Sequence, residues 1–138
     1  MKKDDIFSCG VIVGALAMCF VVIFCAMVER APIETHSMRI SAYCSCEKCC
    51  GVWAKKGINS SGQRITASGY EIQEGDRFVA APAEWAFGTV MDIPGYGKVE
   101  VKDRGGSIKG NRLDVYFDTH QEALNWGVQY LSVQIERK

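Results

Sequence analysis

The sequence predicts a mainly β protein: a small β-barrel of six or seven strands with one short helix, preceded by an N-terminal transmembrane helix. Three observations predict it. From residue 38 onward, short runs of strand-forming residues follow one another between turn signals. These runs do not alternate with long helical segments, so no βαβ pattern arises. Before them, residues 6–28 contain no charged side chain.

The uncharged segment, IFSCGVIVGALAMCFVVIFCAMV, is long enough to cross a hydrocarbon core of roughly 30 Å as a helix. A cleaved signal peptide is the alternative, but its apolar region is usually shorter, and CAMVERAP is a poor cleavage site. Lys2 and Lys3 precede the span and favour an N-terminus inside the cytoplasm. We therefore expect a single-pass protein of the cytoplasmic membrane, with residues 29–37 as a linker and residues 38–138 as an extracytoplasmic domain.

The outer domain is nearly neutral, with 13 Lys and Arg against 12 Asp and Glu from Arg39 onward. The whole chain of 138 residues has a formal net charge of zero. Nucleic-acid binding usually requires a basic surface, so no nucleic-acid partner is expected. A segment of about 100 residues has the size of one domain, and we expect it to be monomeric.

The expected strands follow in chain order. The runs are MRISAY (38–43), RITAS (64–68), RFVAA (77–81), GTVMDI (88–93), KVEVKD (98–103), RLDVYF (112–117) and YLSVQIE (130–136). A hairpin-like turn, PGYG, joins the fourth run to the fifth. The helix is expected just before the last run, because Thr119 and Glu122 match a capping box and Gly127 suits a helix C-terminus.

Four cysteines lie close together in the segment YCSCEKCCG: Cys44, Cys46, Cys49 and Cys50. Outside the cytoplasm such a cluster favours two disulfides, whose pairing stays open. A zinc site and free thiols are the alternatives, although all-cysteine zinc sites usually take two pairs from separate segments. Since His36 and His120 are isolated in the sequence, no catalytic thiol is expected, and no metal or cofactor is assigned.

The segment KDRGGSIKGNRLDVYFD (102–118) places carboxylates among strand-forming residues. Asp114 stands in mid-strand, where aspartate is unfavourable, and residues that break a local rule are often functional. Asp103 ends the preceding run. The connection between them contains Gly105 and Gly106, which allow close approach of backbone or ligand. We therefore expect both carboxylates at the rim of a cleft, whereas Asp118 is explained by its place at a helix start.

These segments together resemble the 3D (three-aspartate) domain family, which is similar to the C-terminal region of MltA-type lytic transglycosylases and to Sps/YuiC-type cell-wall proteins. The resemblance covers residues 38–138. The matching segments are KDRGGSIKGNRLDVYFDTHQEALNWG, AYCSCEKCCG, ITASG, FVAAP, FGT and IPGYG. The resemblance implies a double-psi β-barrel and a muralytic activity on peptidoglycan.

By this resemblance Asp114 is the catalytic acid and Asp103 its acidic partner. Thr66 and Lys109 would line the glycan cleft. The two glycines of the connection and Tyr116, whose ring can stack on a sugar, complete the expected substrate-binding residues. At one position the chain departs from the family: Ala81 stands where many members carry an aspartate before the proline, which favours a weaker or differently tuned activity.

The expected function is thus that of a membrane-anchored lytic transglycosylase that cuts the MurNAc–GlcNAc bond of peptidoglycan by aspartate acid/base catalysis. Ordinary hydrolysis, which uses two carboxyl groups, is a related possibility. A non-catalytic, expansin-like module that binds cell-wall glycan is the alternative from another class, and Ala81 favours it.

Overall fold

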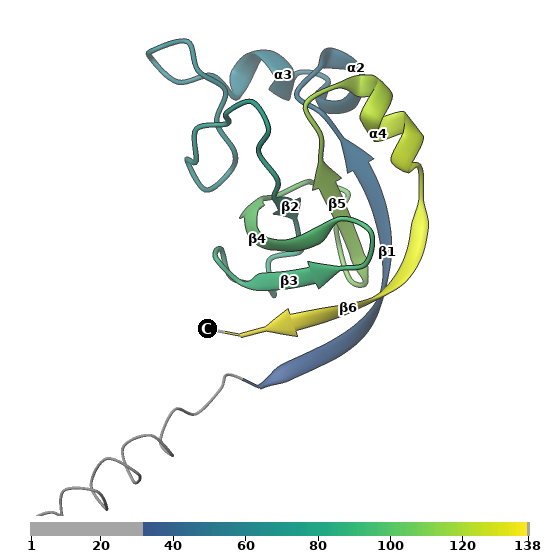
Figure 1. The fold of residues 1–138 in the computed structure, drawn as a ribbon. Coiled ribbons are helices and arrows are strands. Elements are labelled where there is room, and N and C mark those ends of the chain that lie inside the picture. Colours follow the sequence, from purple (N-terminus) through teal and green to yellow (C-terminus); the bar gives the residue numbers. More distant parts are fainter. Residues whose placement is uncertain (1–31, 138) are drawn as a thin grey trace, which may run out of the picture. The chain divides into compact units, whose positions relative to one another are not determined.

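The computed structural model describes residues 32–137. The expected membrane span, residues 6–28, lies outside the described residues, so it stays a prediction. Within residues 32–137, no helix is long and apolar enough to cross a membrane. Six strands in this part of the chain close into a barrel in the order β1-β5-β2-β4-β3-β6 (Figure 1). The predicted class, a mainly β protein with a barrel, is confirmed.

The described chain also contains short helices, and two of them are single turns. The elements in order are β1 (Ile33–Tyr43), α2 (Glu47–Cys50), α3 (Trp53–Lys56), β2 (Val79–Ala80), β3 (Val90–Ile93), β4 (Gly97–Asp103), β5 (Arg112–Tyr116), α4 (His120–Trp126) and β6 (Gln129–Glu136). The pairs β1–β5 and β2–β4 are parallel, and the other strand pairs are antiparallel. The three helices gather at the end of the barrel where β1 and β5 end (Figure 1).

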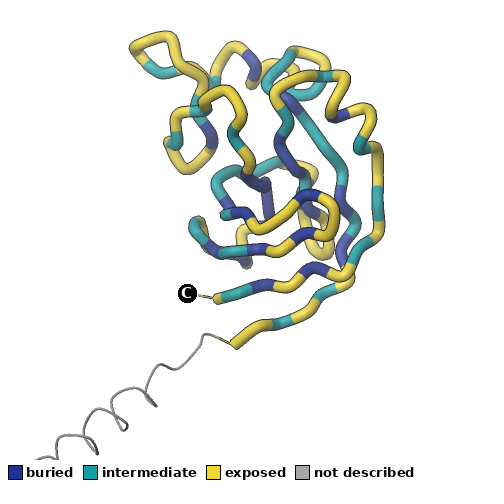
Figure 2. Tube along the Cα trace, in the orientation of Figure 1, coloured by how far each residue is buried: buried dark blue, intermediate teal, exposed yellow. Residues whose placement is uncertain are grey.

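The core follows from strand alternation, because every second side chain of a strand points to the inside of the barrel. Buried and exposed segments accordingly alternate along the strands (Figure 2). The inward side chains are mostly branched aliphatic ones, which pack well on a pleated surface. They include Met38, Ile40, Val79, Met91, Ile93, Val99, Val101, Leu113, Val115, Val133 and Ile135.

The helix α4 begins and ends as predicted. Thr119 Oγ1 accepts a hydrogen bond from the backbone N–H of Glu122 (3.2 Å), and the Glu122 carboxylate accepts one from the N–H of Thr119 (3.0 Å). This reciprocal pair satisfies backbone donors that a helix start leaves free. Gly127 ends the helix with φ of 65°, a left-handed conformation that glycine adopts without steric cost.

The strands differ from the prediction in extent. β1 begins at Ile33 rather than at residue 38, because residues 33–40 pair with β6 along almost its whole length. Part of the expected linker 29–37 is therefore strand. Conversely, residues 64–68 contain only isolated bridges, and the run 77–81 shrinks to the two residues of β2. A β-prone run becomes a strand only where a neighbouring strand pairs with it, and pairing partners come from distant parts of the chain.

Candidate functional site

The two predicted carboxylates, Asp103 and Asp114, lie on two strands that both pair with the short strand β2. Asp103 is the last residue of β4, and Asp114 lies in the middle of β5. Strand β2 runs between β4 and β5, and its residue Ala80 pairs with Asp103 on one side and with Asp114 on the other. Adjacent strands lie about 4.8 Å apart, so the two backbones are roughly 10 Å apart. Both side chains are partly buried.

Asp103 is fixed by donors from three directions. Its Oδ1 accepts hydrogen bonds from the backbone N–H groups of Ala67 and Arg104, both at 2.8 Å. Its Oδ2 accepts one from the hydroxyl of Tyr43 at 2.5 Å. Burial and, after it, the negative charge of Asp103 raise the pKa of Tyr43 well above its usual value, so the phenol keeps its proton and remains a donor. Asp103 is thus held as an acceptor in one orientation.

Asp114 has the opposite environment. Its Oδ1 is buried and has no hydrogen-bond partner among residues 32–137. The pKa of Asp114 is raised to about 6, chiefly by burial. The negative charge of Asp103 also raises this pKa, whereas the hydrogen bond from Ser41 and the positive charge of Arg39 lower it. A carboxyl group with a pKa near 6 holds a proton in a useful fraction of molecules near neutral pH, which is what a general acid requires.

The segment of Thr66 lies beside Asp103, as the Ala67 N–H shows. Thr66 itself is buried, and its Oγ1 lies 2.9 Å from the Oγ of Ser68. Lys109 is exposed on the connection between β4 and β5. The structure therefore brings the ITASG segment to Asp103 and leaves Lys109 exposed on the surface.

The other predicted contacts have clear structural roles. A Cβ at Gly105 would lie 2.7 Å from Cγ1 of Ile108, so close packing within the connection requires this glycine. A Cβ at Gly106 would meet open space. Tyr116 is only 4% exposed; its ring stacks on Phe78 with centroids 4.5 Å apart. Little of the Tyr116 ring is left for a sugar.

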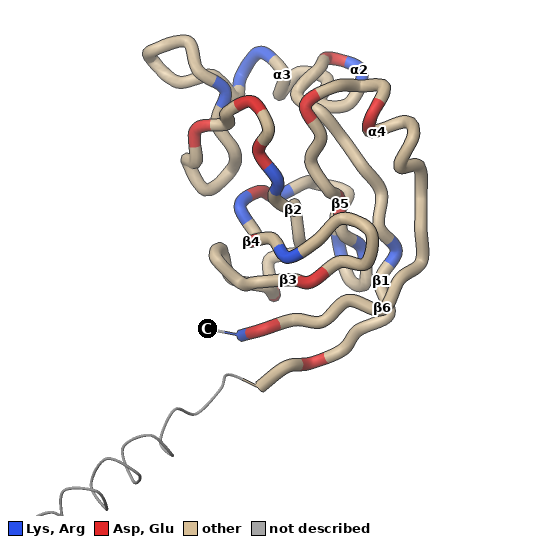
Figure 3. Tube along the Cα trace, viewed as in Figure 1, with Lys and Arg blue, Asp and Glu red and all other residues tan. Residues whose placement is uncertain are grey.

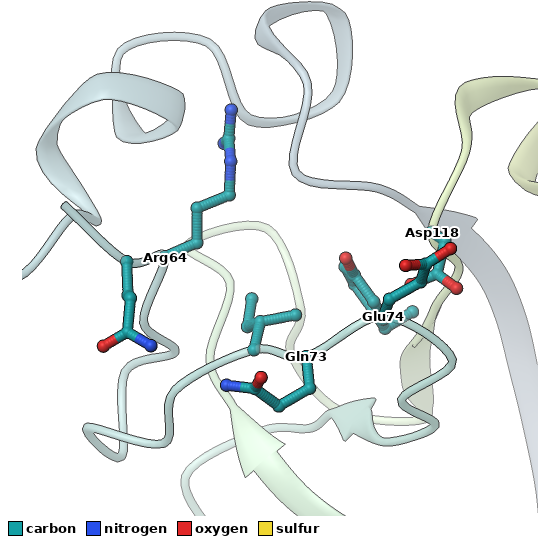
Figure 4. A pocket seen from close by; sticks show the side chains of 7 residues that line it. Arg64, Gln73, Glu74 and Asp118 are labelled. Atoms are coloured by element: carbon teal, nitrogen blue, oxygen red, sulfur yellow. The ribbon is translucent and has the colours of Figure 1, made fainter.

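A hollow of about 450 Å³ opens at the Tyr116 end of β5 (Figure 4). Its lining residues are Gln63, Arg64, Ile72, Gln73, Glu74, Tyr116 and Asp118. Neither Asp103 nor Asp114 lines the hollow. Tyr116, which does line it, lies on the same strand as Asp114. Asp118 accepts a hydrogen bond from the N–H of Gly75 at 2.8 Å, which holds the 72–76 loop at the rim. Asp118 thus has a structural role beyond the predicted one at the helix start.

Sequence reasoning missed Tyr43 as a part of the site. Arg104 donates to the carbonyl groups of Trp85 (2.6 Å) and Ala81 (3.2 Å), and its guanidinium lies over the ring of Phe87. Arg104 therefore anchors the start of the connection between β4 and β5 to residues 81–87. Ala81, at the position where the resemblance leads us to expect an aspartate in many family members, is fully buried in the core. No local pattern marks Tyr43, because its partner Asp103 is distant in the chain.

The cysteine segment differs from the prediction. Cys44, Cys46, Cys49 and Cys50 all carry free thiols, so the expected disulfides are not formed in this structure. His120, expected to be isolated, has its Nδ1 3.3 Å from Cys49 Sγ and 3.5 Å from Cys46 Sγ. The physical reason is that α4 begins at the end of the barrel where the cysteine segment leaves β1, and its first residue enters the cluster.

The comparison with known families adds to this geometry. Residues 77–136 match the family model of the 3D domain. This segment, which is less than half of the chain, is therefore similar to the 3D domain. The predicted resemblance is thereby confirmed for the segment that runs from just before β2 to the end of β6 and includes both Asp103 and Asp114. β1 and the cysteine segment precede the matched part of the 3D domain.

Two curated proteins of Bacillus subtilis (strain 168) are similar to the chain. One is named cell wall-binding protein YocH; it is 32% identical over 74 residues, which are 51% of this chain and 26% of YocH. The other, YabE, is 35% identical over 48 residues, which are 35% of this chain and 12% of YabE. The chain thus covers about a quarter or less of each relative, and the similarity concerns a region the size of the 3D domain.

Among solved structures, the Streptomyces papain inhibitor is similar to the chain. The TM-score is 0.50 at 17% sequence identity, over 78% of this chain and 99% of the inhibitor. At this identity the likeness concerns the fold alone. It supports a barrel fold for this chain that is similar to the double-psi β-barrel of the inhibitor.

Proposed function

We propose that this chain acts on the glycan strands of peptidoglycan and cuts the MurNAc–GlcNAc bond as a lytic transglycosylase. The observation that carries the proposal is the state of Asp114: a carboxyl group with a pKa raised to about 6 and one buried oxygen that has no partner among the described residues. The relative YocH is named as a cell wall-binding protein, which supports the substrate class.

In the proposed reaction the Asp114 carboxyl group gives its proton to the glycosidic oxygen. The bond between that oxygen and C1 of MurNAc breaks, and the leaving sugar departs with the proton. The Asp114 carboxylate then accepts the proton of the 6-hydroxyl of the same MurNAc, whose oxygen forms a bond to C1. The products are a 1,6-anhydro sugar and a free chain end, and Asp114 is protonated again. One carboxyl group serves first as acid and then as base.

Asp103 supports this acid without taking part in proton transfer. Its three hydrogen bonds, from Tyr43, Ala67 and Arg104, hold the group in place. Its negative charge is one of the causes of the raised Asp114 pKa. A fixed negative charge also stabilises the positive charge that develops on the sugar ring when the glycosidic bond breaks.

The surface around the site suits a largely neutral polymer. Positive and negative side chains are interspersed along the described chain (Figure 3). The hollow at the Tyr116 end of β5 offers charged and amide groups, among them Arg64, Gln73 and Glu74, that can form hydrogen bonds with sugar hydroxyls and peptide stems. Its place next to β5 suits a glycan that continues past the reacting bond.

The place of action is part of the proposal. If residues 6–28 form the expected anchor, the barrel follows directly after a short spacer and is held at the outer face of the cytoplasmic membrane. The cell wall is the polymer that a domain at this place meets. We expect a protease added to intact spheroplasts to remove the barrel and to leave a cytoplasmic control protein uncut.

The test is digestion of purified sacculi by the full-length protein in mild detergent, with the soluble products analysed by mass spectrometry. We expect 1,6-anhydro muropeptides from the wild type and from Asp92→Asn, which removes an exposed carboxylate on β3. Asp114→Asn should release none. Reducing-end products in place of anhydro products would show hydrolysis, and release by Asp114→Asn at the wild-type rate would overturn the role of Asp114.

A glycan-binding module without turnover is the second candidate. The buried Ala81 favours it, because this chain lacks one of the family's aspartates. It predicts that the protein sediments with sacculi, that Asp114→Asn sediments equally well, and that no product appears with either protein. Sedimentation and product release, measured on the same samples, separate the two candidates.

A further inference from the structure

The cysteine segment and the start of α4 place four metal-binding atoms together. Sγ of Cys44, Cys46 and Cys49 and Nδ1 of His120 all lie within 4.8 Å of one another. Cys44 Sγ lies 3.7 Å from Cys49 Sγ. From His120 Nδ1 the sulfur atoms are 4.0 Å (Cys44), 3.5 Å (Cys46) and 3.3 Å (Cys49) away. The imidazole nitrogen thus faces all three thiols.

These distances match a tetrahedral zinc centre. With Zn–S bonds of about 2.3 Å and Zn–N bonds of about 2.0–2.1 Å, two sulfur ligands lie about 3.8 Å apart, and a sulfur and a nitrogen ligand about 3.5 Å apart. The observed separations fall around both values. Three thiolates with one imidazole are a known ligand set of closed, structural zinc sites, and soft sulfur ligands disfavour Mg²⁺ and Ca²⁺.

The fold explains why ligands so distant in the sequence meet. β1 and β5 are parallel neighbours, and their ends are in register at Tyr43 and Tyr116. The backbone N–H of Phe117 still donates to the carbonyl of Tyr43 at 2.8 Å, so both segments leave the barrel side by side. The cysteines follow β1 directly, and His120 opens the helix after β5. The capped start of α4 then fixes the position of His120.

The fourth cysteine of the segment is used differently. The Cys50 thiol donates a hydrogen bond to the backbone carbonyl of Cys44 at 3.2 Å, and Cys50 is not one of the four grouped residues. A site of four cysteines would leave the convergence of His120 on the cluster without a role. Disulfides would also leave the approach of His120 to the cysteines without a role. They require two sulfur atoms bonded at about 2.05 Å, whereas Sγ of Cys44 and Sγ of Cys49 are 3.7 Å apart.

We propose that Cys44, Cys46, Cys49 and His120 bind one Zn²⁺ ion, which ties the segment after β1 to the start of α4. The site has a structural role, because four protein ligands leave no open position for a substrate. It directly follows Tyr43, which holds Asp103. Zinc binding therefore stabilises the end of β1 from which the candidate site is built. The proposal is independent of the reaction assigned to Asp114.

The test is the metal content of the full-length protein, produced in zinc-supplemented medium and purified in mild detergent without chelator. Elemental analysis should find one zinc per chain in the wild type and in Cys50→Ser, the matched cysteine control. Cys46→Ser and His120→Gln should lose most of the zinc and melt at lower temperature. Cobalt(II) offered to the metal-free wild type should give the visible absorption of a tetrahedral cobalt–thiolate centre, and this spectrum should change in His120→Gln.

Three results would overturn the proposal. The first is a wild type that holds no zinc and gives no cobalt spectrum. The second is zinc that is lost in Cys50→Ser but kept in His120→Gln, which would indicate a four-cysteine site. The third is an intact mass, measured without reductant, that shows disulfides within this segment. The cobalt spectrum of the wild type tests whether the chain binds a metal through thiolates even if a ligand variant fails to fold.

Discussion

Asp103 and Asp114 flank the same residue: each pairs with Ala80 of β2, from opposite sides. One carboxylate is fixed by three donors, and the other has a buried oxygen without a partner among residues 32–137. The strand between them keeps the carboxylates near enough for one charge to act on the other. The chemical difference between two identical side chains therefore comes from their surroundings.

The pH dependence of glycan cleavage follows from this difference. Asp114 must be protonated at the start, so kcat/KM should fall as the pH rises through about 6, by up to tenfold per pH unit. Asp103→Asn removes a negative charge that raises the Asp114 pKa, so its profile should shift to lower pH. Release of anhydro products from sacculi across a pH series measures both. A rate that stays constant up to about pH 8 would contradict the assignment of the acid.

The same group should make stability depend on pH. Because the pKa of Asp114 is raised from 3.8 to about 6 on folding, its contribution to stability is present below about pH 4 and is lost as the pH rises through 6. Relative to wild type, Asp114→Asn should gain roughly 2 kcal/mol in the free energy of unfolding between about pH 4 and pH 7. Urea unfolding at both pH values measures the change. Asp92→Asn is the control for loss of one exposed negative charge, and an equal gain there would refute the explanation.

Tyr43 should contribute to stability through its hydrogen bond to Asp103. Tyr43→Phe leaves Oδ2 of Asp103 without its donor, and hydrogen bonds to charged groups contribute about 1.5–3 kcal/mol. We expect a loss of that size in the free energy of unfolding. Tyr130→Phe, on a ring that is 75% exposed, is the matched control and should be neutral. If the two variants unfold at the same urea concentration, the hydrogen bond to Asp103 contributes nothing.

The neighbouring glycines of the connection, Gly105 and Gly106, should respond differently to substitution by alanine. Gly105→Ala places a Cβ 2.7 Å from Ile108 and should cost about 1–3 kcal/mol, and this cost should shrink when Ile108 is also alanine. Gly106→Ala meets open space and should leave stability unchanged. If glycan passes over the connection, Gly106→Ala should still weaken sedimentation with sacculi. Thermal unfolding and sedimentation of the variants measure both effects, and equal destabilisation by both substitutions would contradict this packing.

Much of the fold could be predicted because the signals are local. Alternation along residues 112–117 marks one face of a strand, Thr119 with Glu122 marks a helix start, and neither depends on distant contacts. The unfavourable position of Asp114 within a strand pattern singled it out in the same way. The likeness of 77–136 to the 3D domain also lies in the order of its motifs.

Contacts between distant segments could not be read in this way. The extension of β1 back to Ile33, the reduction of residues 77–81 to β2 and the hydrogen bond from Tyr43 to Asp103 each need a partner that the chain supplies elsewhere. The meeting of His120 with the cysteines depends on the parallel pairing of β1 with β5. The sequence by itself determined the kinds of element and the candidate carboxylates, because these depend on neighbouring residues. Only the tertiary structure decided which side chains meet and in what environment each one titrates, because closing the barrel sets burial and pairing.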